Sequence, residues 1–262
     1  MKKLNTMILA LSALAASTFL VSCLNGDGTN KYYGSGVFTV EKTAMGYNLY
    51  SDGAGMVRPT LQSVNDLVGA AGFQNGQRVV LDYTYTDDNF KEEPGKGSYI
   101  DNVELYQGQQ IPKVNILTKE EAESKNLLDP DSIFSIGSEI SIWAYRGYLT
   151  TQHKGRFSVV SDKGIYPTLN IVYDKDENGA PNNIRLKMYY NQHTAKNAQS
   201  TTQTFFTSYP LSMFTSLIPG NDSVTFSIDG LGLSKTFQMK VGREDLTPGN
   251  YIYYNLGYLT KK

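Results

Sequence analysis

Residues 79–86 read Val-Val-Leu-Asp-Tyr-Thr-Tyr-Thr, and this stretch decides the fold prediction. Its odd-numbered positions are apolar or aromatic, whereas its even-numbered positions include Asp82 and two threonines. Alternation with a period of two indicates a strand that buries one face, because successive side chains point to opposite sides of a sheet. Similar short strands recur along the chain, and no long helical period follows residue 22, so the sequence predicts an all-β fold.

The residues on either side of this strand predict a small barrel. Before it, three strand signals lie at 37–41, 47–50 and 56–58, and a helical period covers 60–68, with Thr60 as the expected N-cap. After it, a charged loop at 87–97 leads to a strand near 99–106, which 114–117 extends. Three strands, one helix and two strands is the chain order of an OB-fold, a five-stranded Greek-key barrel. We therefore predict an OB-like barrel over 35–117; a generic small barrel or a β-meander with a helix plug is the alternative.

The second half of the chain predicts a β-sandwich. Thr118 and Glu121 have the spacing of a capping box and open a linker that we place at 118–132. About seven short strands then follow, which is typical of an antiparallel sandwich over 133–262. These strands are expected at 140–149 (with Trp143, the only Trp), 157–160, 169–173, 184–190, 201–209, 224–228 and 236–241.

The N-terminus predicts a lipid anchor. Lys2 and Lys3 precede an apolar stretch at 7–21, which is the layout of a secretory signal peptide. The stretch ends in Leu-Val-Ser-Cys at 20–23, which resembles a bacterial lipobox, and Cys23 is the only cysteine of the chain. We predict a signal peptide over 1–22, lipidation of Cys23, a flexible tether over 23–34 and membrane attachment through that lipid. An ordinary signal peptide that ends near a free Cys is the alternative.

The residue after Cys23 gives an expectation for the location. It is Leu24 and not Asp, which favours the outer membrane, either in its periplasmic leaflet or at the cell surface.

Composition excludes several classes of protein. One Cys and two His cannot form an intramolecular disulfide or a zinc site of the Cys/His type. A net charge of -1 provides no basic surface for nucleic acid. No nucleophile-elbow motif, Ser-Lys motif or phosphate-binding loop occurs. We predict a protein that is not an enzyme, with no catalytic residue, no cofactor and no metal, and we expect His153 and His193 to be solvated.

One segment is a weak candidate for a metal site. Asp174, Asp176 and Asn178 occupy alternate positions before a glycine, as in the first half of a calcium loop. The position that should supply a bidentate Glu is Arg185, and Asp and Asn also favour tight turns. We expect a turn here, with a calcium site as the alternative.

Four short segments carry a family resemblance: Gly76-Gln77-Arg78-Val79, Val114–Lys119, Asn183–Leu186 and Asp222–Val224. With the lipobox, they make the chain similar to the NigD-like lipoproteins of Bacteroidales. The resemblance implies a lipoprotein signal, an OB-like domain and a C-terminal β-sandwich. It also implies a link to bacteriocin production or immunity, and it supplies no ligand-binding residues.

These observations lead to one functional expectation and two alternatives. We expect a non-enzymatic envelope lipoprotein that acts as a binding or interaction module, with an envelope protein or a glycan as its partner. The first alternative is a surface glycan-binding lipoprotein, which exposed coplanar rings among the 19 Tyr would favour. The second is a hydrolase that uses two buried, facing carboxyls out of 25 acidic residues.

Overall fold

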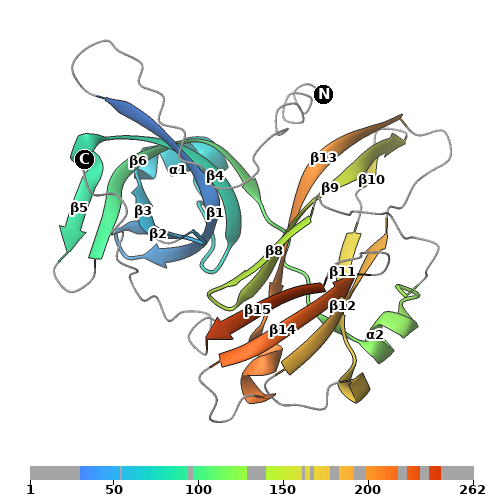
Figure 1. Ribbon diagram of the computed structural model, residues 1–262. Coiled ribbons are helices and arrows are strands. Elements are labelled where there is room, and N and C mark those ends of the chain that lie inside the picture. Colours follow the sequence, from blue (N-terminus) through green and yellow to red (C-terminus); the bar gives the residue numbers. More distant parts are fainter. Residues whose placement is uncertain are drawn as a thin grey trace. The chain divides into compact units, whose positions relative to one another are not determined.

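The computed structural model describes residues 30–53, 55–93, 97–128, 140–160, 163–165, 168–177, 183–191, 199–217, 223–230 and 236–242. Strands dominate these residues, so the predicted all-β fold is confirmed (Figure 1). The chain forms two compact units, and the described residues of the first end at Pro112, directly before Lys113 of the second.

The first unit is a closed barrel. Its elements are β1 (Lys31–Thr43), β2 (Gly46–Ser51), β3 (Met56–Pro59), α1 (Leu61–Val68), β4 (Arg78–Thr86), η1 (Asp87–Asn89), β5 (Phe90–Glu93) and β6 (Gly97–Gln110). The sheet order is β3-β2-β1-β4-β6, and a parallel pairing of β3 with β6 closes the ring, while the short β5 pairs with the first residues of β6. This is the predicted OB-like arrangement, with α1 between the third and fourth barrel strands.

The barrel core follows the alternation that predicted it. The inward residues of β4 are buried together with those of β1 and β2, and the cluster includes Val79, Leu81, Tyr83, Tyr85, Phe38, Val40 and Leu49. Helix α1 begins as expected, because the Thr60 hydroxyl accepts a hydrogen bond from the Ser63 N–H at 3.2 Å. The barrel strand β6 ends at Gln110, so residues 114–117 do not extend it.

The second unit is a two-sheet sandwich. Its elements are β7 (Leu117–Thr118), α2 (Lys119–Ser124), β8 (Ile140–Tyr145), β9 (Tyr148–Val160), β10 (Lys163–Ile165), β11 (Thr168–Tyr173), η4 (Lys175–Glu177), β12 (Asn183–Asn191), β13 (Gln199–Pro210), η5 (Ser212–Leu217), β14 (Ser223–Gly230) and β15 (Thr236–Gly242). One sheet has the order β10-β9-β13, with β8 also paired to β9, and the other has the order β15-β14-β12-β11-β7. The predicted capping box is present at Thr118 and Glu121, where α2 begins.

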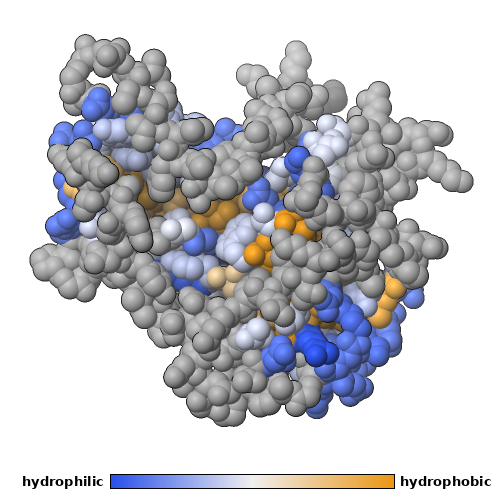
Figure 2. Space-filling model, in the orientation of Figure 1, coloured by the Kyte–Doolittle hydropathy of each residue, from blue (hydrophilic) through white to orange (hydrophobic). Residues whose placement is uncertain are grey.

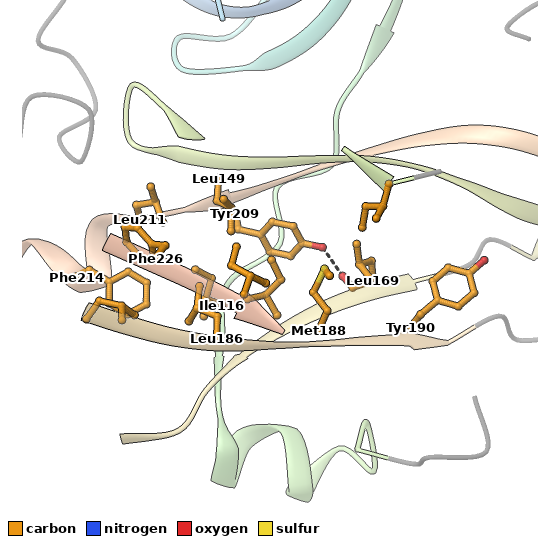
Figure 3. Packing of buried hydrophobic residues seen from close by; sticks show 14 residues of the cluster. Ile116, Leu149, Leu169, Leu186, Met188, Tyr190, Tyr209, Leu211, Phe214 and Phe226 are labelled. Atoms are coloured by element: carbon orange, nitrogen blue, oxygen red, sulfur yellow. Dashed lines mark hydrogen bonds between the residues drawn. The ribbon is translucent and has the colours of Figure 1, made fainter. Parts of the chain in front are cut away.

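The sandwich core lies between the two sheets (Figure 3). Side chains from β9 and β13 meet those from β11, β12 and β14, and aromatic rings such as Phe214 and Phe226 pack edge to face. The hydroxyl of the fully buried Tyr209 donates a hydrogen bond to the carbonyl of Leu169 in the facing sheet. That bond satisfies the one polar atom that this ring carries into the core.

Two details of the sandwich differ from the prediction. The stretch 140–149 is not one strand but a hairpin, since Arg146 and Gly147 form the turn between β8 and β9 with φ values of 45° and 80°. The second sheet is also not purely antiparallel, because β12 pairs in parallel with β14 and β11 with β7. The chain passes from β12 to β13 in the other sheet and then returns, so β14 runs in the direction of β12.

Candidate functional site

A polar network lies on barrel strands β1 to β3, on the side that faces away from the barrel core. Its Glu41 and Arg58 are partly exposed, whereas Asn48 and Tyr50 are buried, with 9% and 3% of their surface exposed. The amide of Asn48 donates to Glu41 Oε2 at 2.6 Å, and the hydroxyl of Tyr50 donates to the same oxygen at 2.9 Å. Arg58 Nε donates to Asn48 Oδ1 at 2.9 Å. Their neighbours along the strands, such as Leu49, lie in the core, so these four side chains point to the outside of the barrel.

Arg58 is held from a second direction. Its guanidinium carbon lies 4.2 Å from the centre of the Tyr99 ring, which β6 supplies beside β3. This distance allows a cation–π interaction, which fixes the guanidinium against the sheet. We name Glu41, Asn48, Tyr50, Arg58 and Tyr99 the barrel-face cluster. OB-folds bind their ligands on the face of their second and third strands, which is where this cluster lies.

The chemistry of the barrel-face cluster suits recognition. It combines a carboxylate, an amide, a phenol and a cation supported by an aromatic ring, all joined by hydrogen bonds or ring contact. Such a fixed set of donors and acceptors can bind a polar partner with little loss of side-chain entropy. The sequence does not reveal this cluster, because Arg58 and Tyr99 are 41 positions apart and come together only through the pairing of β3 with β6.

A second outward feature of the barrel is Tyr106. The register of β4 and β6 shifts between Asp82 and Tyr83, so Tyr106 is the extra residue of a bulge, and it is 54% exposed. Its ring meets that of Tyr33 at 84°, and partial burial, followed by the charge of Asp82, raises its pKa. The two rings are therefore edge-on and not coplanar, which is not the arrangement expected of a flat stacking platform.

The predicted lipidation site lies outside the described residues. Cys23 precedes Asn30, the first described position, by seven residues, and its lipidation stays a prediction. Within the described ranges, no helix is long and apolar enough to cross a bilayer.

The structure corrects the expectation for His153, which is buried and not solvated. It lies in β9, is 1% exposed, and packs against the rings of Tyr190 and Phe205. Neither ring nitrogen has a hydrogen-bond partner among the described residues, and burial lowers its pKa to about 4. The polar neighbours Gln152 and Lys154 suggested exposure, but the ring itself points inward between the sheets. His193 lies outside the described residues.

In the calcium-loop candidate, the carboxylate of Asp174 contacts other groups of the protein. Asp174 Oδ2 lies 3.0 Å from Lys119 Nζ, and Oδ1 accepts the Asp176 N–H at 3.0 Å, so both carboxylate oxygens have a partner. The hydrogen bond from Lys119 lowers the pKa of Asp174. Asn178 lies outside the described residues.

Hydrophilic side chains gather over α2, which carries Lys119 (Figure 2).

Among the described residues, the other acidic groups do not gather around a metal position. The loop after β4 keeps Asp87 and Asp88 exposed in η1, and Lys91 and Glu92 exposed in β5. In the part of the chain that the structure describes, no three His, Cys, Asp or Glu side chains are placed to hold a metal ion together.

The sequence has no match among protein-family models or among curated proteins. Among solved structures, the chain is similar to a toxin-related protein from Parabacteroides distasonis, with a TM-score of 0.52 and 14% identity over 81% of this chain and 95% of that chain. This likeness shows that the two-unit fold is shared, and at that identity it shows the fold alone.

Two other solved structures are similar over most of their length. One is a NigD-like immunity protein from Bacteroides caccae, with a TM-score of 0.46 and 14% identity over 83% of this chain and 94% of that chain. The other is described as a lipoprotein from Bacteroides fragilis, with a TM-score of 0.47 and 12% identity over 80% of this chain and 96% of that chain.

Proposed function

We propose that this chain is an outer-membrane lipoprotein that acts as a binding module and whose barrel recognises an envelope protein through the barrel-face cluster. One observation carries the proposal: Arg58 is held between Asn48 and the ring of Tyr99 on the strand face where OB-folds bind ligands. A cation fixed in this way keeps its orientation before a partner arrives, which favours specific polar contacts.

The anchor in this proposal is the lipid on Cys23. The lipobox-like ending of the apolar stretch supports it, and two or more acyl chains hold a protein on a membrane far more firmly than one. Replacement of Cys23 by Ala should move the protein from the membrane fraction to the soluble fraction. Unchanged sedimentation with membranes and unchanged mobility on a gel would exclude lipid attachment.

The recognition role is tested with the anchored protein in intact envelopes. Chemical crosslinking followed by affinity purification should recover an envelope protein with the native chain and lose it with Arg58→Ala. Lys42→Ala is the matched control, because Lys42 is an exposed cation on β1 of the same sheet and is not part of the cluster. A crosslinked partner that is recovered equally with Arg58→Ala would move recognition away from this face.

The finer biological role rests on the resemblance to the NigD-like lipoproteins. That resemblance supports a link to bacteriocin production or immunity, which a survival assay can test. Cells that produce the anchored protein should survive a bacteriocin from related strains better than cells that carry Arg58→Ala. Equal killing of both strains by every bacteriocin tried would remove the immunity role.

A surface glycan-binding lipoprotein is the second candidate. The exposed ring of Tyr106 favours it, since aromatic faces stack on sugar rings. The 84° angle to Tyr33 gives it less support than a coplanar pair would. A glycan array with the native chain and with Tyr106→Ala decides: binding that the variant loses supports a sugar ligand, and no binding removes it.

A further inference from the structure

Strand β13 forms an edge of its sheet. It pairs with β9 from Gln199 to Pro210 without a register shift, and both β8 and β10 lie on the far side of β9. A contact on the outer side of β13 lies near the end of the strand. There Val114 N–H donates to the Ser208 carbonyl at 2.9 Å, next to a parallel bridge between Lys113 and Ser208.

This contact fixes the direction of the backbone groups along β13. The Ser208 carbonyl points away from β9, and successive residues of a strand point their backbone groups to opposite sides. Thr202, Thr204 and Phe206 therefore also present their N–H and C=O groups to the outer edge. Within the described part of the chain, none of these three residues has a hydrogen bond on that side. The carbonyl of the next residue, Thr207, points the other way, toward β9. There it accepts a hydrogen bond from the side-chain hydroxyl of Thr151.

The sequence of β13 lacks the features that usually protect an edge strand. Residues 199–210 read Gln-Ser-Thr-Thr-Gln-Thr-Phe-Phe-Thr-Ser-Tyr-Pro, with no charged residue and no proline before the last position. Natural edges are commonly protected by charges, prolines, bulges or short length. Threonine and aromatic residues instead favour strand pairing.

We propose that β13 pairs with β13 of a second copy of this chain, antiparallel and about a two-fold axis at Thr204. In this register Thr204 faces its own copy and Thr202 faces Phe206, so the outward backbone groups of all three positions meet in about six hydrogen bonds. A threonine pair and two Thr–Phe pairs are favourable cross-strand neighbours. The strand is self-complementary because it has no charge to repel its copy. The pairing joins two four-stranded sheets into one continuous sheet.

The test measures association of residues 24–262, which contain both folded units. Sedimentation equilibrium over a range of concentrations should show a reversible dimer for the native sequence. Thr204→Pro should give a monomer with an unchanged circular dichroism spectrum, because its N–H faces the outer edge and contributes nothing to the pairing with β9. Thr204→Val keeps the N–H and should leave the dimer intact. A native chain that is monomeric up to its solubility limit, or a dimer that Thr204→Pro leaves intact, overturns the proposal.

A second variant covers the case in which Thr204→Pro fails to fold. Thr204→Lys leaves the backbone unchanged and places two like charges opposite each other at the two-fold axis. It should weaken dimerisation strongly at low salt and less at high salt. Because this fragment contains no other cysteine, a nitroxide on Thr204→Cys also reports the register. The distance between the two labels should be shorter at 204 than at 202 or 206, and a different order would exclude this register.

Discussion

Arg78 and Asp52 form a buried ion pair with two contacts. Arg78 Nη1 lies 2.6 Å from Asp52 Oδ1, Nη2 contacts Oδ2, and Nη1 also donates to the Thr39 hydroxyl at 2.8 Å. The Arg78 side chain is fully buried, and its carbonyl accepts the Ile111 N–H. One residue thus joins the start of β4 to β1, to the turn after β2 and to the chain just after β6.

Removal of one partner of this pair should destabilise the barrel. Asp52→Ala removes the carboxylate that contacts the buried guanidinium of Arg78, and we expect the free energy of unfolding to fall by about 3–5 kcal/mol. Urea denaturation measures the change. The control is Glu177→Gln, since the Lys187–Glu177 pair is well exposed and should contribute less than about 1 kcal/mol. Equal effects of the two substitutions would contradict the structural role of Asp52.

Close packing between Gly34 and Tyr83 gives a second prediction. The two residues face each other across β1 and β4, and a Cβ at position 34 would overlap the Tyr83 ring. That ring cannot move aside freely, because Phe38 and Tyr85 pack against it in the core. Gly34→Ala should therefore lower stability by about 1–3 kcal/mol in thermal or urea unfolding.

Gly53→Ala is the control for the substitution at Gly34. A Cβ at position 53 meets only the Ser51 hydroxyl oxygen, at 3.6 Å, which is an ordinary contact. Its effect should stay within about 0.5 kcal/mol. If Gly34→Ala is equally mild, the space beside Tyr83 is larger than the structure indicates.

The sequence predicted features that depend on local pattern. Alternation placed Val79, Leu81, Tyr83 and Tyr85 on one face, and the same residues form the barrel core. Hydroxyl caps at Thr60 and Thr118 were also predicted, because a cap needs only residues within one helical turn. Chain order predicted the barrel topology, since three strands, one helix and two strands match an OB-fold.

Features that join distant positions were not predicted. Nothing in the sequence indicates that Arg78 buries its charge against Asp52, which lies 26 positions earlier. The turn at Arg146 was missed because its left-handed backbone conformation usually calls for Asn, Asp or Gly. The burial of His153 depends on Phe205, which faces it from β13.

The contacts of Asp174 predict that calcium does not bind at the turn after β11. Both carboxylate oxygens already have partners, one at Lys119 and one at the Asp176 N–H. Thermal unfolding of residues 24–262 should therefore be the same with and without millimolar calcium. Asp174→Asn is the matched variant: a calcium-dependent rise in melting temperature that this substitution removes would establish a site.

Burial of His153 predicts that the sandwich loses stability in acid. The pKa of His153 is lowered to about 4, whereas a histidine in the unfolded chain titrates near 6.5. Between these values the unfolded state binds more protons than the folded state, so the free energy of unfolding falls as the pH decreases. The contribution is fully present above pH 6.5, and about 2–3 kcal/mol should be lost between pH 7.5 and 4.5.

A comparison with His153→Leu isolates this contribution from the carboxylates that titrate in the same range. The variant has no proton to gain at this position, so its stability relative to the native chain should rise by about 2–3 kcal/mol between pH 7.5 and 4.5, whatever the packing offset at neutral pH. Urea unfolding at both pH values gives the difference. The enclosure of His153 by Tyr190 and Phe205 should hinder its protonation in the folded chain. If the difference in free energy of unfolding between variant and native chain does not change with pH, His153 gains a proton as easily in the folded chain as in the unfolded one, and the prediction is wrong.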